Sequence, residues 1–135
     1  MKLRTVLVVD DNDADLLYVR IVLEAAGIAE RVLCFGTAQE ALAHLAGTEG
    51  AQADLVLLDL NMPEMGGFGF LDAYGLLLRS GPARAGVVVL TSSPDPADRR
   101  RAMAHACVRG YLVKPIEPCA ALGLASLLQA GGQQR

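Results

Sequence analysis

Residues 54–67 constrain the fold of this chain more than any other stretch. Residues 55–58 are four apolar side chains without a polar break, a pattern typical of a strand that is buried on both faces of a sheet. Asp59 follows directly, and Pro63 with the glycine pair at 66–67 then supplies turn chemistry that ends a strand before a helix. An aspartate at the end of a buried strand lies at the sheet edge where open α/β proteins bind ligands, although Asp59 considered alone could equally cap a turn.

The same pattern of an apolar run that ends on polar side chains recurs along the chain. The segments between the runs carry the start and stop signals of helices. These signals are cap candidates at 12–15, Gly27, Thr37 with Glu40 three residues later, Asp95 before Pro96, and the glycine pair at 131–132. We expect strands at 6–9, 31–35, 55–58, 87–90 and 110–113, and helices at 14–26, 37–46, 68–78, 96–108 and 118–130.

Strict alternation of five strands with five helices predicts a parallel sheet that has helices on both faces. The expected fold class is α/β, with a doubly wound, flavodoxin-like (βα)5 arrangement and strand order 2-1-3-4-5. The 135 residues suit one such domain and leave no room for a second. We therefore expect a single domain over 1–135, with no effector domain after the last helix.

Composition narrows the possible partners. The chain carries 12 basic and 15 acidic residues, so it lacks the basic surface that nucleic-acid binding requires, and membrane binding is not expected. Cys34, Cys107 and Cys119 have the spacing of neither a zinc site nor a disulfide framework, and we expect packed thiols in a reducing compartment. The apolar run near the N-terminus is too short for a secretory signal, and no apolar stretch reaches the length of a membrane span. A cytoplasmic location is the resulting expectation.

Polar side chains follow four of the predicted strands: Asp10 and Asp11, Asp59, Thr91, and Lys114. In strand order 2-1-3-4-5 the first and third strands are neighbours, which brings the three aspartates together. Three carboxylates in one crevice repel one another, and oxygen ligands at an open edge favour Mg²⁺ as the balancing cation. With a lysine ammonium and a threonine hydroxyl beside them, they form a receptacle for a phosphoryl group carried on a carboxylate. Each residue could singly be a cap, a strand end or a solvated charge, so the prediction depends on their joint occurrence.

This set of residues, with Met62-Pro63 after Asp59 and Pro115 after Lys114, resembles the receiver domain of two-component response regulators over nearly the whole chain. The resemblance implies that a histidine kinase transfers a phosphoryl group to the chain and that the chain signals through protein contacts. It implies a phosphoacceptor that assists its own phosphorylation and dephosphorylation, and it does not imply an enzyme.

The resemblance also implies a role for each site residue. Asp59 is then the phosphoacceptor, and a cis peptide bond between Lys114 and Pro115 aims the lysine over the crevice. The resemblance further implies that Asp11, Asp59 and the Asn61 carbonyl bind Mg²⁺ and that Asp10 holds the site through water. It implies that Lys114 contacts the phosphoryl oxygens and that Thr91 moves toward them. Tyr111 is then a rotating aromatic that reports whether Asp59 is phosphorylated. For Tyr111 a partly buried strand aromatic is the simpler alternative.

Residues 60–63 and 90–93 are similar to stand-alone regulators that are paired with phytochrome-type histidine kinases. Two features depart from the common receiver pattern. Gly66 occupies a position where an aspartate often precedes the glycine, and two prolines in 93–96 leave the path of the loop after Thr91 open.

Other functions remain as alternatives. Residues 11–13 are similar to the Asp-x-Asp start of haloacid-dehalogenase-like phosphatases, which use an aspartate nucleophile, but Asp15 departs from that pattern and the chain leaves little room for a substrate cap. An EF-hand is excluded because Leu16 and Val22 replace the glycine and glutamate that its loop requires. A receiver that binds partners without phosphorylation is a third possibility, and no residue favours it. The kinase, the downstream protein, and the role as output, relay or phosphate sink stay open.

The last helix predicts a homodimer. Only Ser126 and Gln129 are polar between 120 and 130, whereas a helix that packs on one side of a sheet needs only a stripe of apolar positions. At least one of four leucines must therefore point outward, and receivers similar to this chain commonly pair through the fourth helix, fifth strand and fifth helix. On this basis Leu124→Glu or Leu128→Glu should halve the mass of the dimer; the other two leucines are Leu122 and Leu127.

Overall fold

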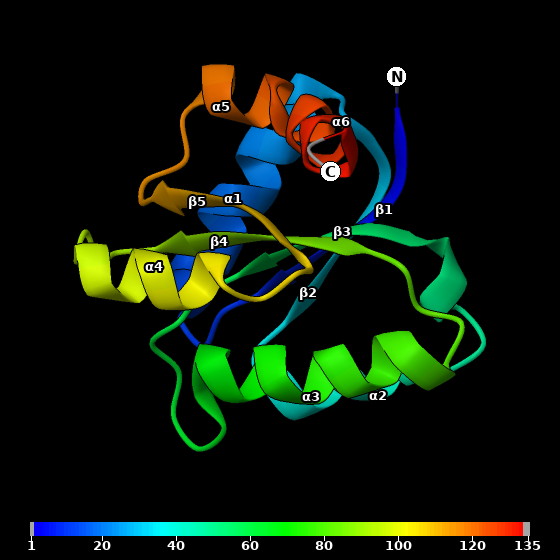
Figure 1. Ribbon diagram of the computed structural model, residues 1–135. Helices are drawn as coiled ribbons and strands as arrows, with labels where there is room; N and C mark the ends of the chain where they lie inside the picture. The colour runs from blue at the N-terminus through cyan, green and yellow to red at the C-terminus, as the bar shows by residue number, and fades with distance from the viewer. Residues whose placement is uncertain (1, 134–135) are drawn as a thin grey trace.

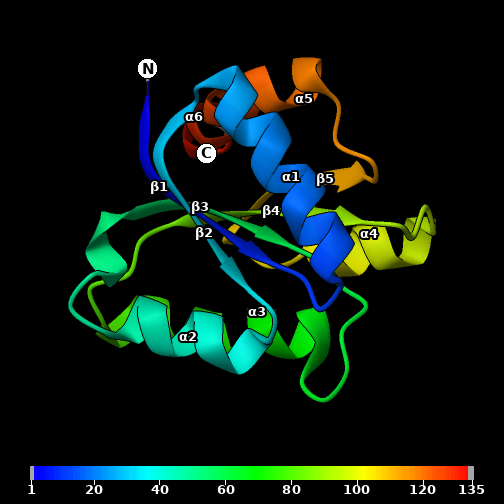
Figure 2. The same cartoon turned by 180° about the vertical axis from the view of Figure 1, so that it is seen from behind.

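The computed structural model describes residues 2–133, with side chains as far as Leu128, and shows one parallel sheet between two layers of helices (Figure 1). The strands lie in the order β2-β1-β3-β4-β5, as predicted. Helices α1, α5 and α6 cover one face of the sheet, and α2, α3 and α4 cover the other (Figures 1 and 2). The strands are β1 Leu3–Val9, β2 Ala29–Phe35, β3 Ala53–Leu58, β4 Gly86–Thr91 and β5 Val108–Val113. The helices are α1 Asp13–Ala26, α2 Ala38–Ala46, the short 3-10 turn η1 Gly50–Gln52, α3 Gly66–Ser80, α4 Pro96–Met103, α5 Pro118–Leu122 and α6 Leu124–Gln133.

Each central strand sends alternate side chains into two separate cores. Val6 and Val8 pack with α1, α5 and α6, whereas Leu7 and Val9 pack with α2 and α3. Strand β3 follows the same rule, and residues 55–58 are at most 1 % exposed. Because both faces are covered, every position in these strands must be apolar, which explains the unbroken runs in the sequence.

The predicted helix ends are largely confirmed. The Asn12 side chain caps α1 by accepting from the Asp15 N–H, and Gly27 ends that helix with φ of 67°. Thr37 caps α2, and Asp95 caps α4 with Pro96 in its first turn. In the described part of the chain, no helix is both long and apolar enough to cross a membrane.

Three expectations about the C-terminal third are wrong. Helix α4 ends at Met103 rather than 108, because Val108 instead joins the sheet beside Val87 and starts β5 two residues early. The predicted helix 118–130 is broken at Gly123 into α5 and α6. Helix α6 then continues through the glycine pair at 131–132, since a glycine weakens a helix by about 1 kcal/mol without forbidding it.

The break at Gly123 decides which leucines face outward. Leu122 is 63 % exposed, which confirms that at least one of these leucines lies on the surface. Leu124 is fully buried, and Leu127 and Leu128 pack against the core. A glutamate at 124 would therefore disrupt the fold, so Leu124 was the wrong position to test a surface contact. The expectation of packed thiols holds for the half-buried Cys34 and Cys107 and fails for Cys119, which is exposed in the first turn of α5.

Two glycines should respond oppositely to alanine. A Cβ at Gly50 would overlap the backbone carbonyl of Leu45, whereas a Cβ at Gly75, inside α3, would meet nothing within 4 Å. Gly50→Ala should lower the free energy of unfolding by about 2 kcal/mol, because backbone must move. Gly75→Ala should raise it by about 0.5–1 kcal/mol through helix propensity. Urea denaturation of both variants checks this, and equal effects at the two positions would contradict it.

Candidate functional site

The carboxyl edge of the sheet gathers the polar residues that were predicted from the strand ends. Val9 of β1 pairs with Leu58 of β3, so Asp10 and Asp59 leave the sheet at the same level. The backbone ladder continues past the strands, because the Asp59 N–H donates to the Val9 carbonyl at 3.0 Å. On the other side of β3, the Lys114 N–H donates to the carbonyl of Thr91 at 2.8 Å. Four strand ends thus place these groups along one edge.

Three aspartates form a carboxylate cluster at this edge. Asp10, Asp11 and Asp59 each offer an oxygen, and these atoms lie within 4.8 Å of one another. Asp10 and Asp59 are buried, at 3 % and 5 % exposed, whereas Asp11 is exposed. Buried like charges at this separation require positive charge nearby. The all-oxygen donor set, open to solvent at Asp11, is chemically suited to Mg²⁺.

The Lys114 ammonium supplies positive charge to the cluster. Its Nζ lies 2.6 Å from an oxygen of Asp10, 2.8 Å from one of Asp15, and 3.4 Å from one of Asp59. Burial by itself would lower the pKa of Lys114, but the hydrogen bonds to Asp10 and Asp15 and the charge of Asp59 outweigh burial and raise this pKa. Burial raises the pKa of Asp10, and the hydrogen bond from Lys114 offsets that only in part. Lys114 is therefore held as an ammonium among the carboxylates.

Backbone N–H groups donate to Oδ1 of both buried aspartates, whereas the Lys114 ammonium contacts Oδ2 of each. The Asn12 N–H donates to Asp10 at 3.0 Å, and the Asn61 N–H donates to Asp59 at 3.3 Å. Each carboxylate is thereby fixed by one backbone donor and one ammonium donor. The predicted cis peptide bond between Lys114 and Pro115 is confirmed.

The loop after Asp59 turns back sharply against the end of β3. Glu64 and Gly66 both have positive φ, 64° and 70°, so glycine is the favourable residue at 66. A Cβ on Gly67 would come within 2.5 Å of the Leu60 Cα and 2.7 Å of the Asp59 carbonyl oxygen. The glycine pair therefore lets the start of α3 approach the phosphoacceptor candidate closely.

Thr91 and Tyr111 are joined through Ser93. Thr91 is fully buried and its hydroxyl accepts the Ser93 N–H at 3.4 Å. The Tyr111 hydroxyl donates to the Ser93 carbonyl at 2.8 Å, and the ring is only 7 % exposed. The Ser93 hydroxyl donates to Asp98 at 2.8 Å, and Arg99 donates to the Tyr111 carbonyl at 3.3 Å. The loop between β4 and α4 is thus bonded to β5 through one serine.

Sequence reasoning did not assign roles to Asp15, Ser93, Asp98 or Arg99. From the sequence, Asp15 is interpreted only as a cap candidate and as a departure from the phosphatase pattern, although its place one helical turn after Asp11 is a usable signal. The roles of Ser93, Asp98 and Arg99 depend on the path of the 93–96 loop, which its prolines made hard to predict.

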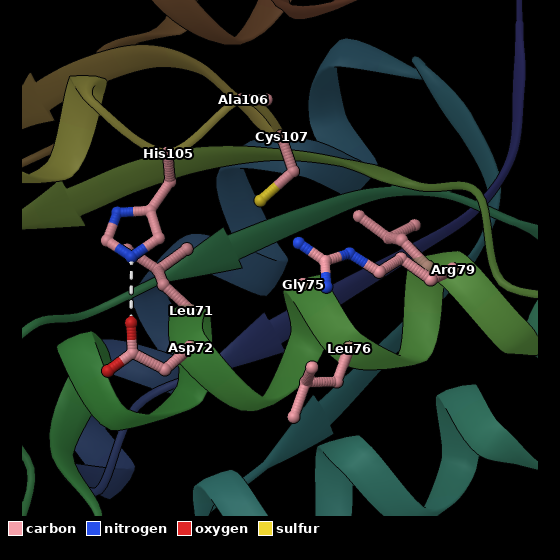
Figure 3. Close-up of a pocket in the computed structure, with 9 residues that line it drawn as sticks. Leu71, Asp72, Gly75, Leu76, Arg79, His105, Ala106 and Cys107 are labelled. Carbon is pink, nitrogen blue, oxygen red and sulfur yellow. Dashed lines mark hydrogen bonds and ion pairs between the residues drawn. The ribbon is translucent and has the colours of Figure 1, made fainter.

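A cavity of about 500 Å³ lies elsewhere, between α3 and the segment that precedes β5 (Figure 3). In Figure 3 the Arg79 guanidinium and the Cys107 thiol point into it, and the His105 ring bonds Asp72 at 3.0 Å across one end. None of the strand-end polar residues lines this cavity. Its size therefore does not make it the candidate site, because the convergent charged groups are at the carboxylate cluster.

Comparison with known proteins agrees with the geometry. The model of the response regulator receiver domain matches residues 6–123. The chain is 34% identical over 110 residues to the sensory/regulatory protein RpfC of Xanthomonas campestris, covering 82% of this chain and 14% of that protein. It is 36% identical over 115 residues to the probable methanogenesis regulatory protein FilR2 of Methanothrix harundinacea, covering 82% of this chain and 72% of that protein.

Solved structures show the same architecture. The chemotaxis protein CheY4 of Vibrio cholerae superposes with a TM-score of 0.72 at 30% identity, covering 95% of this chain and 98% of that one. A two-component response regulator from Cytophaga hutchinsonii has the same fold, with a TM-score of 0.82 at 23% identity over 99% of this chain and 100% of that one. These findings give no support to a haloacid-dehalogenase-like phosphatase. With a family match over most of its length and the carboxylate, threonine and lysine residues gathered at one sheet edge, this chain belongs to the response regulator receiver domains.

Proposed function

We propose that Asp59 accepts a phosphoryl group from a histidine kinase, with Mg²⁺ as cofactor, and that the phosphorylated chain signals through protein contacts. The observation that carries this proposal is the state of the Asp59 carboxylate. It is buried at a strand end, it lies in the cluster with Asp10 and Asp11, and it is hydrogen-bonded by both the Asn61 N–H and the Lys114 ammonium. Such a carboxylate is fixed in place and is surrounded by groups that stabilise added negative charge.

The chemistry follows from the positions of these groups. An Asp59 oxygen attacks the phosphorus of the donor, the bond between phosphorus and the donor nitrogen breaks, and the electron pair stays on the donor imidazole. Lys114 and the Thr91 hydroxyl donate to oxygens of the transferred group. Bound Mg²⁺ would neutralise charge on those oxygens. In this proposal Asp11, Asp59 and the Asn61 carbonyl would hold the ion, and Asp10 would hold it through water. With these groups the chain would assist its own phosphorylation and dephosphorylation.

Thr91 and Tyr111 form the switch in this proposal. The Thr91 hydroxyl accepts from the Ser93 N–H, and the Tyr111 hydroxyl donates to the carbonyl of the same residue. Movement of Thr91 toward a phosphoryl group would change both bonds together. The aromatic ring on β5 would then carry the state of Asp59 to the surface of β5 and α4.

The kinase would dock on α1. Leu17, Tyr18 and Ile21 are 59 %, 43 % and 55 % exposed on this helix, which starts beside the carboxylate cluster. An apolar stripe on the helix that starts beside the cluster suits a helical partner that delivers its phosphohistidine to Asp59. The sequence at 60–63 and 90–93 supports a kinase of the phytochrome type. Unpaired cysteines at 34, 107 and 119 support a reducing, cytoplasmic location.

A homodimer through α4, β5 and α5 is also part of the proposal. These elements share the edge of the sheet at β5 (Figure 1). Leu122 of α5 is 63 % exposed and Val113 of β5 is 46 % exposed. A groove of about 310 Å³ lies between β5 and α5, lined partly by Val113 and Ile116. A symmetric contact between two copies would cover this apolar surface.

Phosphorylation is tested by incubation with acetyl phosphate and Mg²⁺. The chain should be labelled once, as an acid-stable and base-labile acyl phosphate, because Asp59 is the buried nucleophile of the cluster. Asp59→Asn should remove the label and EDTA should prevent it, whereas Asp72→Asn, at an exposed aspartate of α3 outside the carboxylate cluster, should label normally. Label that persists in Asp59→Asn, or that is indifferent to EDTA, would refute the proposal.

The switch contact is tested by three tyrosine variants, since each tyrosine hydroxyl donates to a backbone carbonyl. Tyr111→Phe should lower the free energy of unfolding by about 1 kcal/mol, because the Ser93 carbonyl loses a buried donor. Tyr18→Phe should lower the free energy of unfolding by less, since Tyr18 is 43 % exposed and water can replace its hydroxyl as the donor to the Ile116 carbonyl. Tyr74→Phe should lower the free energy of unfolding at least as much as Tyr111→Phe, since the hydrogen bond from Tyr74 to the Ala85 carbonyl is fully buried. Urea denaturation ranks the three, and an equal effect of Tyr18→Phe would contradict the switch geometry.

The dimer is tested by sedimentation of the unphosphorylated chain at micromolar concentration. The wild-type chain should have twice the monomer mass, and Leu122→Glu should halve it while leaving the thermal unfolding midpoint nearly unchanged. Leu17→Glu, at a similarly exposed leucine of α1 outside the three elements of the proposed contact, should remain dimeric. A wild-type monomer at every concentration would show that Leu122 is simply exposed to water.

A further inference from the structure

All three N–H groups of the Lys114 ammonium are occupied by carboxylates. Lysine has three donors and no acceptor, and here they reach Asp10, Asp15 and Asp59 at 2.6, 2.8 and 3.4 Å. The Nζ atom therefore lies closer to Asp10 and Asp15 than to the phosphoacceptor candidate. The contact with Asp59 is the longest of the three, so movement of the ammonium toward Asp59 would strengthen its hydrogen bond to a phosphoryl oxygen there.

Asp15 is the partner that can be given up at least cost. The Asp10 side chain is 5 % exposed, so loss of its ammonium would leave a buried carboxylate without a counter-charge. The Asp15 side chain is 42 % exposed, and water can solvate it when the ammonium leaves. Its position is set by helix α1, where the Asn12 side chain accepts from the Asp15 N–H at 3.0 Å.

We propose that Asp15 is a positioning residue that holds the Lys114 ammonium back from Asp59 in the unphosphorylated chain and releases it when a phosphoryl group arrives. This inference rests on the proposed function of Asp59. Asp15 slows phosphorylation in this proposal, because its ion pair holds the ammonium away from Asp59 and so weakens the contact of Lys114 with the phosphoryl oxygens. Removal of the Asp15 charge should therefore make phosphorylation faster.

The simpler role for Asp15 is a favourable charge at the N-terminus of α1. Asp13 has that same role, since it also lies in the first turn, and it is exposed. Asp13 makes no hydrogen bond or ion pair to Lys114. Asp13→Asn is therefore a matched control, with the same change of charge on the same turn.

The pairing is tested first in the metal-free, unphosphorylated chain. Only two lysines are present, Lys2 and Lys114, so the side-chain ammonium groups give two assignable signals in nitrogen NMR spectra. The Lys114 ammonium protons should exchange with water more slowly than those of the exposed Lys2. Asp15→Asn should speed that exchange, and Asp13→Asn should not. Equal exchange in the two variants would overturn the proposal without reference to phosphorylation.

The consequence is tested by the rate of Asp59 labelling with acetyl phosphate, with Mg²⁺ at a saturating concentration for each variant. Asp15→Asn should label about threefold faster than Asp13→Asn, the size of effect that a partly exposed ion pair permits. Equal rates, or a slower Asp15→Asn, would overturn the role of Asp15 while leaving the proposed function intact. A wild-type chain that takes no label would overturn both, and Asp59→Asn serves as the blank.

Discussion

The structure depends on an unfavourable arrangement, two buried carboxylates side by side, that is balanced by one ammonium. Asp10 and Asp59 end adjacent strands and are nearly free of solvent, so their charges cannot be screened by water. Lys114 reaches them from the far side of the sheet, two strands away from β3. The fold thus places electrostatic strain at the edge where it can be relieved by a cation, and the apolar layers on both sides supply the stability that tolerates it.

The strand order explains why this balance is possible. In a doubly wound sheet, successive strands are added on one side of β1 and then on the other, so β1 and β3 become neighbours. This strand order puts Asp10 and Asp59 next to each other although 49 positions separate them in the chain. Strand β4 stands between β3 and β5, so Lys114 must cross over β4 to reach the carboxylates. The buried Thr91 lies at the end of that intervening strand, which places its hydroxyl within the same row of groups.

The strands and the strand-end residues could be predicted because both cores demand unbroken apolar runs, so the polar residue that follows each run is conspicuous. The helix starts that have a side-chain cap, at Asn12 and Asp95, could also be predicted from the sequence. The end of α4 could not be predicted in this way, because Val108 pairs with Val87 in the sheet and does not extend the helix. Asp15 escaped assignment because its contact with Lys114 depends on the direction of α1 relative to the sheet, which no local pattern encodes.

Ser93 makes four hydrogen bonds: its N–H donates to Thr91, its carbonyl accepts from Tyr111, and its hydroxyl donates to Asp98 and accepts from the Asp95 N–H. Because one residue makes all four bonds, a movement of Ser93 would change them together rather than one by one, and the loop between β4 and α4 would have few intermediate positions. The surface of α4 would then behave as a two-position element and not as a gradually adjustable one. A partner that binds this surface would then distinguish two conformations only. If half of the Asp59 groups were phosphorylated, the sample would be a mixture of these two conformations and not a single intermediate one.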